Sequence, residues 1–186
     1  MNTPTPNQPA STSTLRSSLL LLFGVFLSFL FPILNGLSQS YDLSRDFSLS
    51  SNPNGVWSYG YKTTLGGAFT LFGVSRQATD EGGALIDIWS KNSYEDAAIY
   101  HNGSGVTGRA LGTEGVYPPG TVWFLPGAAG NLDTYCVIRF KVPVGAGGNY
   151  QLITVTEPYL NGPHSGDTDF HVLHDGAELF GEFLAA

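Results

Sequence analysis

Apolar and polar side chains alternate in the stretch from Trp123 to Val155. The even positions at its centre form an almost wholly apolar row: Thr134, Cys136, Ile138, Phe140 and Val142. A period of two residues is typical of a half-buried strand. Pro143 and the glycines after it end this strand, because proline has no amide to donate to a sheet and glycine favours turns. An extended segment begins again at Asn149, so the stretch predicts a central β-hairpin.

Other short runs rich in β-branched and aromatic residues lie between turn signals made of Gly, Pro, Asn and Asp. The runs cover residues 56–62, 69–76, 84–90, 97–101, 121–125, 134–142, 150–156, 170–174 and 177–183. Many short strands separated by turns are typical of an antiparallel β-sandwich or barrel. No segment has the length and periodicity of a long amphipathic helix. We therefore predict a single all-β domain, an antiparallel β-sandwich, over residues 41–186.

The clearest hairpin signal is His174-Asp175-Gly176-Ala177. Asp-Gly tolerates the two positive φ angles of a type I′ turn, which joins strands with a two-residue loop. The sequence supplies one strand after this turn and no further strand to cover it. An uncovered edge favours pairing with another chain. Either the sandwich closes with these strands, or the sequence is a fragment, or a partner supplies the missing strand.

The first 40 residues differ from the rest of the chain. Residues 2–14 are polar and aperiodic, Arg16 carries a positive charge, and residues 19–34 are a nearly continuous apolar run. Small residues follow, and the whole pattern describes a secretory signal peptide cleaved after Ser38 or Ser40. An uncleaved membrane anchor is the alternative, but the run is short for a span and contains a proline. We predict export to the cell surface or the extracellular space, with residues 1–40 as the signal segment.

The charge balance argues against one class of partner. The chain has 8 basic and 15 acidic residues, a net charge of −7, and removing the leader with Arg16 makes it −8. Because phosphate neutralisation supplies most of the affinity for nucleic acids, we predict no nucleic-acid binding. Contact with a membrane is expected only through the N-terminal segment, if it stays uncleaved.

Cys136 is the only cysteine, so no disulfide forms within the chain. Its place in the apolar row predicts a buried thiol that behaves as a small apolar side chain. A reactive or intermolecular thiol is the alternative.

Several motifs resemble those of a known family. They are Asn52-Pro53-Asn54-Gly55-Val56-Trp57-Ser58-Tyr59-Gly60, Leu125-Pro126-Gly127, Tyr135 to Pro143, Gly148-Asn149-Tyr150 and Thr168 to Gly176. Together they resemble a jelly-roll module common in exported proteins of planctomycetes, verrucomicrobia and cyanobacteria, often with a PEP-CTERM-type sorting tail. The resemblance covers most of residues 42–183. It implies a jelly-roll, galactose-binding-like sandwich, export and, by analogy with such folds, carbohydrate binding.

The chain departs from this family pattern at two places. Leu125 stands where the pattern usually has histidine. The pattern also continues past residues 174–177 into further strands and a sorting tail, which this sequence lacks. The resemblance therefore implies that the domain is truncated at its C-terminus.

The densest group of polar residues lies between His164 and Asp175 and suggests a metal site. Asp169 and His171 are two residues apart and so share one face of a strand. The carboxylates of Asp167 and Asp169, with the turn at Gly166, suit Ca²⁺, which takes oxygen ligands from carboxylates and carbonyls. Zinc is less favoured because the histidines lack a ligand spacing. The alternative is an ordinary turn followed by exposed strand residues.

Two groups of aromatic residues are candidates for stacking on a sugar ring. Trp57, Tyr59 and Tyr61 share one face of their strand, and their neighbours favour placing that face in the core. Trp89 is the better platform, because Ile86 and Ile88 are expected to take the buried face of residues 84–90. Asp87 and Trp89 would then point outward together, a common sugar-binding pair. A second packed layer over this face explains the pattern equally well.

The sequence offers weak support for catalysis. A glycosidase needs two carboxylates at a fixed separation, and the acidic residues cannot be paired from sequence. No Gly-x-Ser-x-Gly elbow and no phosphate-binding loop are present. We predict an exported, non-catalytic binding module, most simply for carbohydrate. The alternatives are a structural protein that assembles into homo-oligomers through its last strand, and a glycoside-active enzyme.

Overall fold

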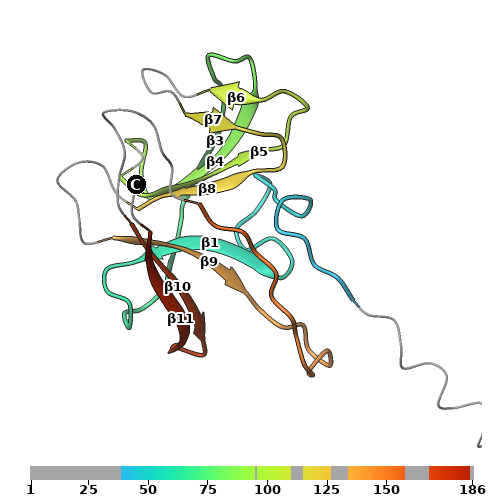
Figure 1. Ribbon diagram of the computed structural model, residues 1–186, viewed down its shortest axis with the longest axis vertical. Coiled ribbons are helices and arrows are strands. Elements are labelled where there is room, and N and C mark those ends of the chain that lie inside the picture. Colours follow the sequence, from blue (N-terminus) through green and yellow to red (C-terminus); the bar gives the residue numbers. More distant parts are fainter. Residues whose placement is uncertain (1–38, 95, 110–114, 127–133, 158–167, 185–186) are drawn as a thin grey trace, which may run out of the picture. The chain divides into compact units, whose positions relative to one another are not determined.

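The chain folds as antiparallel β-structure, which confirms the predicted all-β class (Figure 1). The computed structural model describes residues 39–94, 96–109, 115–126, 134–157 and 168–184, and it contains no helix among them. Residues 1–38 of the predicted leader, which covers residues 1–40, lie outside the described residues. Within the described ranges, no helix is long and apolar enough to cross a membrane.

Eleven strands are described, of which several are only two residues long. They are β1 (Trp57–Lys62), β2 (Thr70–Leu71), β3 (Val74–Thr79), β4 (Leu85–Ser90), β5 (Ala98–Asn102), β6 (Gly108–Arg109), β7 (Val116–Tyr117), β8 (Val122–Leu125), β9 (Tyr135–Phe140), β10 (Thr168–His174) and β11 (Ala177–Leu184).

Two sheets form the main part of the fold. One has the order β2-β1-β9, and the other has the order β3-β4-β5-β8. Figure 1 shows β1 and β9 lying side by side, and their register pairs Tyr59 with Ile138 and Tyr61 with Cys136. Because paired residues point to the same face of a sheet, these four side chains form one apolar patch.

A core cluster fills the space between these two sheets. Tyr59 of β1, Trp89 of β4 and Ile99 of β5 are buried in it, and Cys136 and Ile138 of β9 pack against it. Trp57 and Tyr61 also pack against this cluster, so the aromatic row of β1 faces the core as predicted. Residues contributed by both sheets to one cluster are the mark of face-to-face sheet packing.

The other face of β4 and β5 is also buried. Ile86, Ile88 and Ala98 form a second cluster with Tyr100 and Trp123 packed against it. The short β6-β7 pair lies over this face: the Tyr117 ring stacks on Trp123 at 3.8 Å between centroids. At Gly108 an added Cβ would lie 3.4 Å from Ile86. The four-stranded sheet therefore has apolar layers on both sides.

The predicted central hairpin is wrong. Strand β9 pairs with β1, which is far away in sequence, rather than with residues 150–156. Residues 149–157 form no strand, and Leu152, Ile153 and Val155 are exposed. The β-propensity of this segment is real, but a strand also needs a neighbouring backbone to pair with, and sequence does not show whether one is present.

The C-terminal hairpin is confirmed. Strands β10 and β11 pair with His174 opposite Ala177. Both loop residues have positive φ, 49° at Asp175 and 84° at Gly176, as a type I′ turn requires. A bulge at residues 172–173 shifts the register along the pair. Within the described residues, β10 and β11 pair only with each other.

Candidate functional site

Trp89 does not form an exposed platform, so the prediction for this residue is wrong. Its side chain is 6% exposed and belongs to the core between the two sheets. The indole Nε1 donates a hydrogen bond to the Ser48 carbonyl at 2.8 Å. Residues 41–50 cover this face of β4, and a covering layer of this kind was the alternative that the sequence left open.

The Asp87 carboxylate also contacts other side chains of the protein. Its Oδ1 accepts a hydrogen bond from Gln77 Nε2 at 2.8 Å, and its Oδ2 lies 3.4 Å from His101 Nδ1. The strand registers place these residues side by side, because Gln77 of β3 is opposite Asp87 and Asp87 is opposite His101 of β5. A sugar hydroxyl would have to displace these partners. The pair Asp87 and Trp89 is therefore not an open sugar site.

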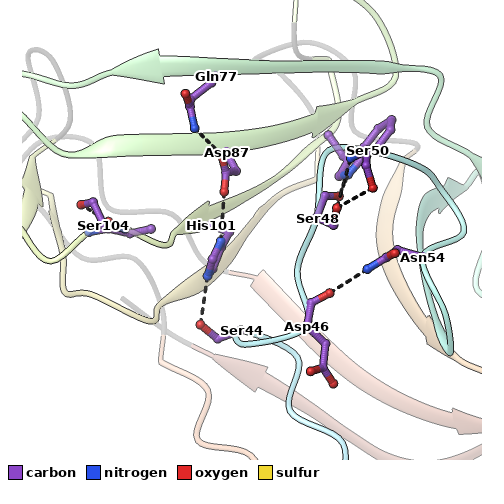
Figure 2. Close-up of polar contacts among 11 residues, drawn as sticks. Ser44, Asp46, Ser48, Ser50, Asn54, Gln77, Asp87, His101 and Ser104 are labelled. Atoms are coloured by element: carbon purple, nitrogen blue, oxygen red, sulfur yellow. Dashed lines mark hydrogen bonds and ion pairs between the residues drawn. The ribbon is translucent and has the colours of Figure 1, made fainter.

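The contacts of Asp87 continue into a chain of polar groups, which we call the polar row: Gln77, Asp87, His101 and Ser44 (Figure 2). His101 Nε2 lies 2.9 Å from Ser44 Oγ, at hydrogen-bond distance. The row crosses three neighbouring strands and ends on residues 41–50. It is the only Ser-His-Asp arrangement found in the described part of the chain.

The polar row is shielded from solvent at its centre. The His101 side chain is 7% exposed, and the Phe47 ring stacks on it at 4.7 Å between centroids. Gly103 lies against the same ring, where an added Cβ would come within 2.8 Å of His101 Cε1. The imidazole therefore contacts Ser44, Asp87 and Phe47 and has little contact with bulk water.

Ser, His and Asp in this order of contact are the groups that activate a serine nucleophile. Acyl transfer also needs amide groups free to bind the developing oxyanion. The amide after Ser44, that of Arg45, donates to Asp42 Oδ1 at 3.0 Å, and the nearby Gly120 amide donates to the Asn102 carbonyl. Negative charge on Asp42 would further oppose an oxyanion at this turn. The arrangement therefore suits a polar link between residues 41–50 and β5 better than a catalytic centre.

Sequence reasoning missed Ser44, His101 and Gln77. These residues lie far apart along the chain, and only the register of β3, β4 and β5 brings them together. His101 follows the apolar Ala98 and Ile99 in a short strand, which could have marked it as a buried polar group. No signal in the sequence pointed to Ser44.

Cys136 was predicted to be buried, and it is partly buried against the core cluster. Its Sγ lies 2.8 Å from the Leu125 carbonyl and 3.3 Å from the Ala98 carbonyl. Burial raises the pKa of the thiol to about 12, in spite of these hydrogen bonds. Since the thiolate is the reactive form, this cysteine is a poor nucleophile at neutral pH.

The structure describes only one of the two residues predicted to bind calcium. Asp169 is an exposed residue of β10, opposite Phe183 of β11, and Asp167 lies outside the described residues. No three His, Cys, Asp or Glu gather as metal ligands in the ranges that the structure describes. Calcium binding at Asp167 and Asp169 stays a prediction, which thermal melting with Ca²⁺ and with chelator tests.

Two C-terminal segments each expose several large apolar side chains. We call residues 149–156 the free segment and β11 the outer strand. The free segment exposes Leu152, Ile153 and Val155, and the outer strand exposes Leu179, Phe180 and Phe183. Clusters of exposed apolar side chains usually mark an interaction site.

Comparison with known proteins gave no relative: no family model, no curated protein and no solved structure matches this chain.

Proposed function

We propose that this chain is an exported, non-catalytic interaction module of jelly-roll type that works at the cell surface or outside the cell. It binds an extended segment of a partner along the C-terminal hairpin β10-β11. The apolar leader pattern and the resemblance to exported bacterial jelly-roll modules support the location. The unpaired edge and the exposed apolar side chains of the outer strand, within the described residues, support binding along the hairpin.

A single observation carries this proposal: the outer strand is paired on one side and exposes large apolar side chains. Within the described residues it pairs only with β10, while Leu179 is 69% and Phe183 is 60% exposed. An edge of this kind presents unpaired amide and carbonyl groups beside apolar side chains. Strand addition uses both, because the backbone groups give affinity and the side chains give specificity.

A non-catalytic role is supported by how the polar row is arranged. Each of its groups has a partner within the protein, and its centre is covered by Phe47. Solvent reaches the two ends of the row, at the exposed Gln77 and the half-buried Ser44. The row acts as a structural link, because a part-buried hydrogen bond between Ser44 and His101 ties residues 41–50 to β5.

Carbohydrate binding, the first expectation from the sequence, now lacks the platform named for it, because Trp89 is buried. The two modes of binding can be separated by one pair of experiments. Phage-displayed random peptides are selected on the immobilised intact protein, and the same protein is applied to a glycan array.

We expect the selection to enrich extended peptides in which apolar residues alternate with uncharged polar ones. Leu179→Lys with Phe183→Lys should lower peptide retention at least tenfold, because two charged side chains replace the apolar contacts of the outer strand. Val106→Lys is the matched control, since Val106 is also an exposed apolar residue but lies in a loop away from the outer strand in the sequence. Peptide retention that survives the hairpin substitutions, or strong glycan retention in all variants, would contradict the proposal.

A further inference from the structure

The free segment has the composition of a strand, but within the described residues no strand pairs with it. Its sequence, Asn149-Tyr150-Gln151-Leu152-Ile153-Thr154-Val155-Thr156, contains no proline and no charged residue. All eight amides can therefore donate to a sheet. It nevertheless forms no strand, and Ile153 is 81% and Val155 is 86% exposed. Uncharged segments of high β-propensity rarely stay unpaired, because their exposed apolar side chains and backbone groups favour association.

The outer strand has the matching properties. It is eight residues long, the same length as the free segment. Its apolar side chains lie on both faces of the hairpin, because Phe180 is opposite Val172 and Phe183 is opposite Asp169 of β10. The free segment also has apolar side chains on both sides, with Leu152 on one and Ile153 and Val155 on the other. An added strand of this composition would cover apolar groups on both faces at once.

Charge decides between the two ways in which copies of this chain could pair. The outer strand carries Glu178 and Glu182. Two outer strands side by side would bring four carboxylates within the length of one strand, and like charges across strands are destabilising. The free segment carries no charge, so its pairing with the outer strand avoids this repulsion.

We propose that the partner of the outer strand is the free segment of a second copy of this chain. This inference rests on the proposed function and names its partner. Each copy donates residues 149–156 to the β11 edge of the other, so the two contacts are equivalent and the dimer closes on itself. The exchange pairs backbone groups of both segments and covers their exposed apolar side chains.

Disulfide trapping between copies tests this pairing. Thr154→Cys and Leu179→Cys are made separately in the intact protein, one of them with a larger affinity tag, and are mixed with a mild oxidant. We expect a mixed cross-linked dimer, at least ten times more abundant than the product of Thr154→Cys mixed with Val106→Cys. The native Cys136 serves as the background, because its burial should leave the wild-type protein uncross-linked.

Three outcomes would overturn the inference. These are no mixed dimer at tens of micromolar protein, equal cross-linking with the Val106→Cys control, or a Leu179→Cys product with itself that exceeds the mixed one. The last result would mean that outer strands pair with each other.

Light scattering provides the second measurement. The wild-type protein should have twice the monomer mass, and Ile153→Lys with Val155→Lys should reduce it to the monomer mass. Both substitutions lie at exposed positions, so loss of folding does not explain a loss of the dimer. If the chain is a monomer while the displayed peptides still depend on the hairpin, this inference fails and the proposed function stands. If the peptide selection fails too, both fail.

Discussion

The strands at the centre of the fold and the two C-terminal segments share the same chemistry but have opposite surroundings. In β4 and β5, side chains on both faces are buried, and the polar groups among them are hydrogen-bonded. In the free segment and the outer strand, side chains of the same kind are exposed. Alternation in sequence thus indicates a strand, but it does not indicate whether the neighbouring strand belongs to the same chain.

The difference has a physical basis in what covers each region. The face of β4 that carries Trp89 is covered by residues 41–50, through the Phe47 ring and the Ser48 carbonyl. In the described residues the outer strand has one paired edge, and the free segment has none. We infer that the first region stabilises the domain and that the second one acts on a partner. Each of the predictions below separates these two roles.

The largest expected effect is at the centre. Trp89→Ala should lower the free energy of unfolding by about 3 to 5 kcal/mol, because it removes a buried indole and leaves a cavity. Urea unfolding followed by tyrosine fluorescence or circular dichroism measures the change. Leu179→Ala, measured in protein dilute enough to be monomeric, is the matched control and should stay within about 0.5 kcal/mol. Similar losses for both residues would remove the distinction between the two regions.

The polar row should contribute less than the apolar core. His101→Ala leaves Asp87 and Ser44 without a buried partner, which costs about 2 to 3 kcal/mol. Ser44→Ala removes one hydrogen bond and should cost about 1 kcal/mol. His174→Ala, an exposed histidine in the C-terminal hairpin turn, serves as the control. A His101→Ala protein as stable as wild type would show that the row does not link residues 41–50 to the sheet.

Cys136 predicts a dependence of stability on pH. Burial raises its pKa from 9.0 to about 12, so the folded state keeps a proton that the unfolded state releases. The contribution is fully present below pH 9.0 and is lost as the pH rises toward about 12, by at most about 1.4 kcal/mol per pH unit. Tyrosine side chains also titrate in this pH range, so comparison with Cys136→Ala isolates the contribution of the thiol. Identical slopes for both proteins above pH 9.0 would contradict the burial of this thiol.

The smallest expected effect is the absence of a reaction. A fluorophosphonate probe labels serines that are activated for acyl transfer. Since the amide after Ser44 is already bonded to Asp42, we expect no more labelling at Ser44 than at Ser48. Mass spectrometry of the labelled peptide locates the modification. Labelling at Ser44 that is lost in His101→Gln would instead identify the polar row as catalytic machinery.

The all-β class, the positions of most strands and the Asp175-Gly176 turn could be predicted from the sequence. They depend on local chemistry, such as alternation along Tyr135–Phe140 and the tolerance of Asp and Gly for positive φ. The pairing of β9 with β1 could not be predicted, because it joins segments far apart in the chain.

The site was harder to predict than the fold. Trp89 and Asp87 were correctly placed together on one face of β4, but the layer over that face comes from residues 41–50, which have no clear pattern of their own. The polar row depends on the register of β3, β4 and β5, and a shift of one residue would move its side chains to opposite faces of the sheet. The outer strand could be predicted from the sequence, whereas residues 149–156 were wrongly predicted as a strand, because strand pairing depends on the whole fold.

Hydrogen exchange measured at two protein concentrations tests the central claim most directly. Amides of β1, β4, β5 and β9 should be protected at both concentrations, because their partners lie within one chain. Amides of residues 149–156, and those amides of β11 that do not bond to β10, should exchange quickly in dilute protein and become protected in concentrated protein. Equal protection of these segments at both concentrations, whether high or low, would contradict the claim that a second chain pairs with them.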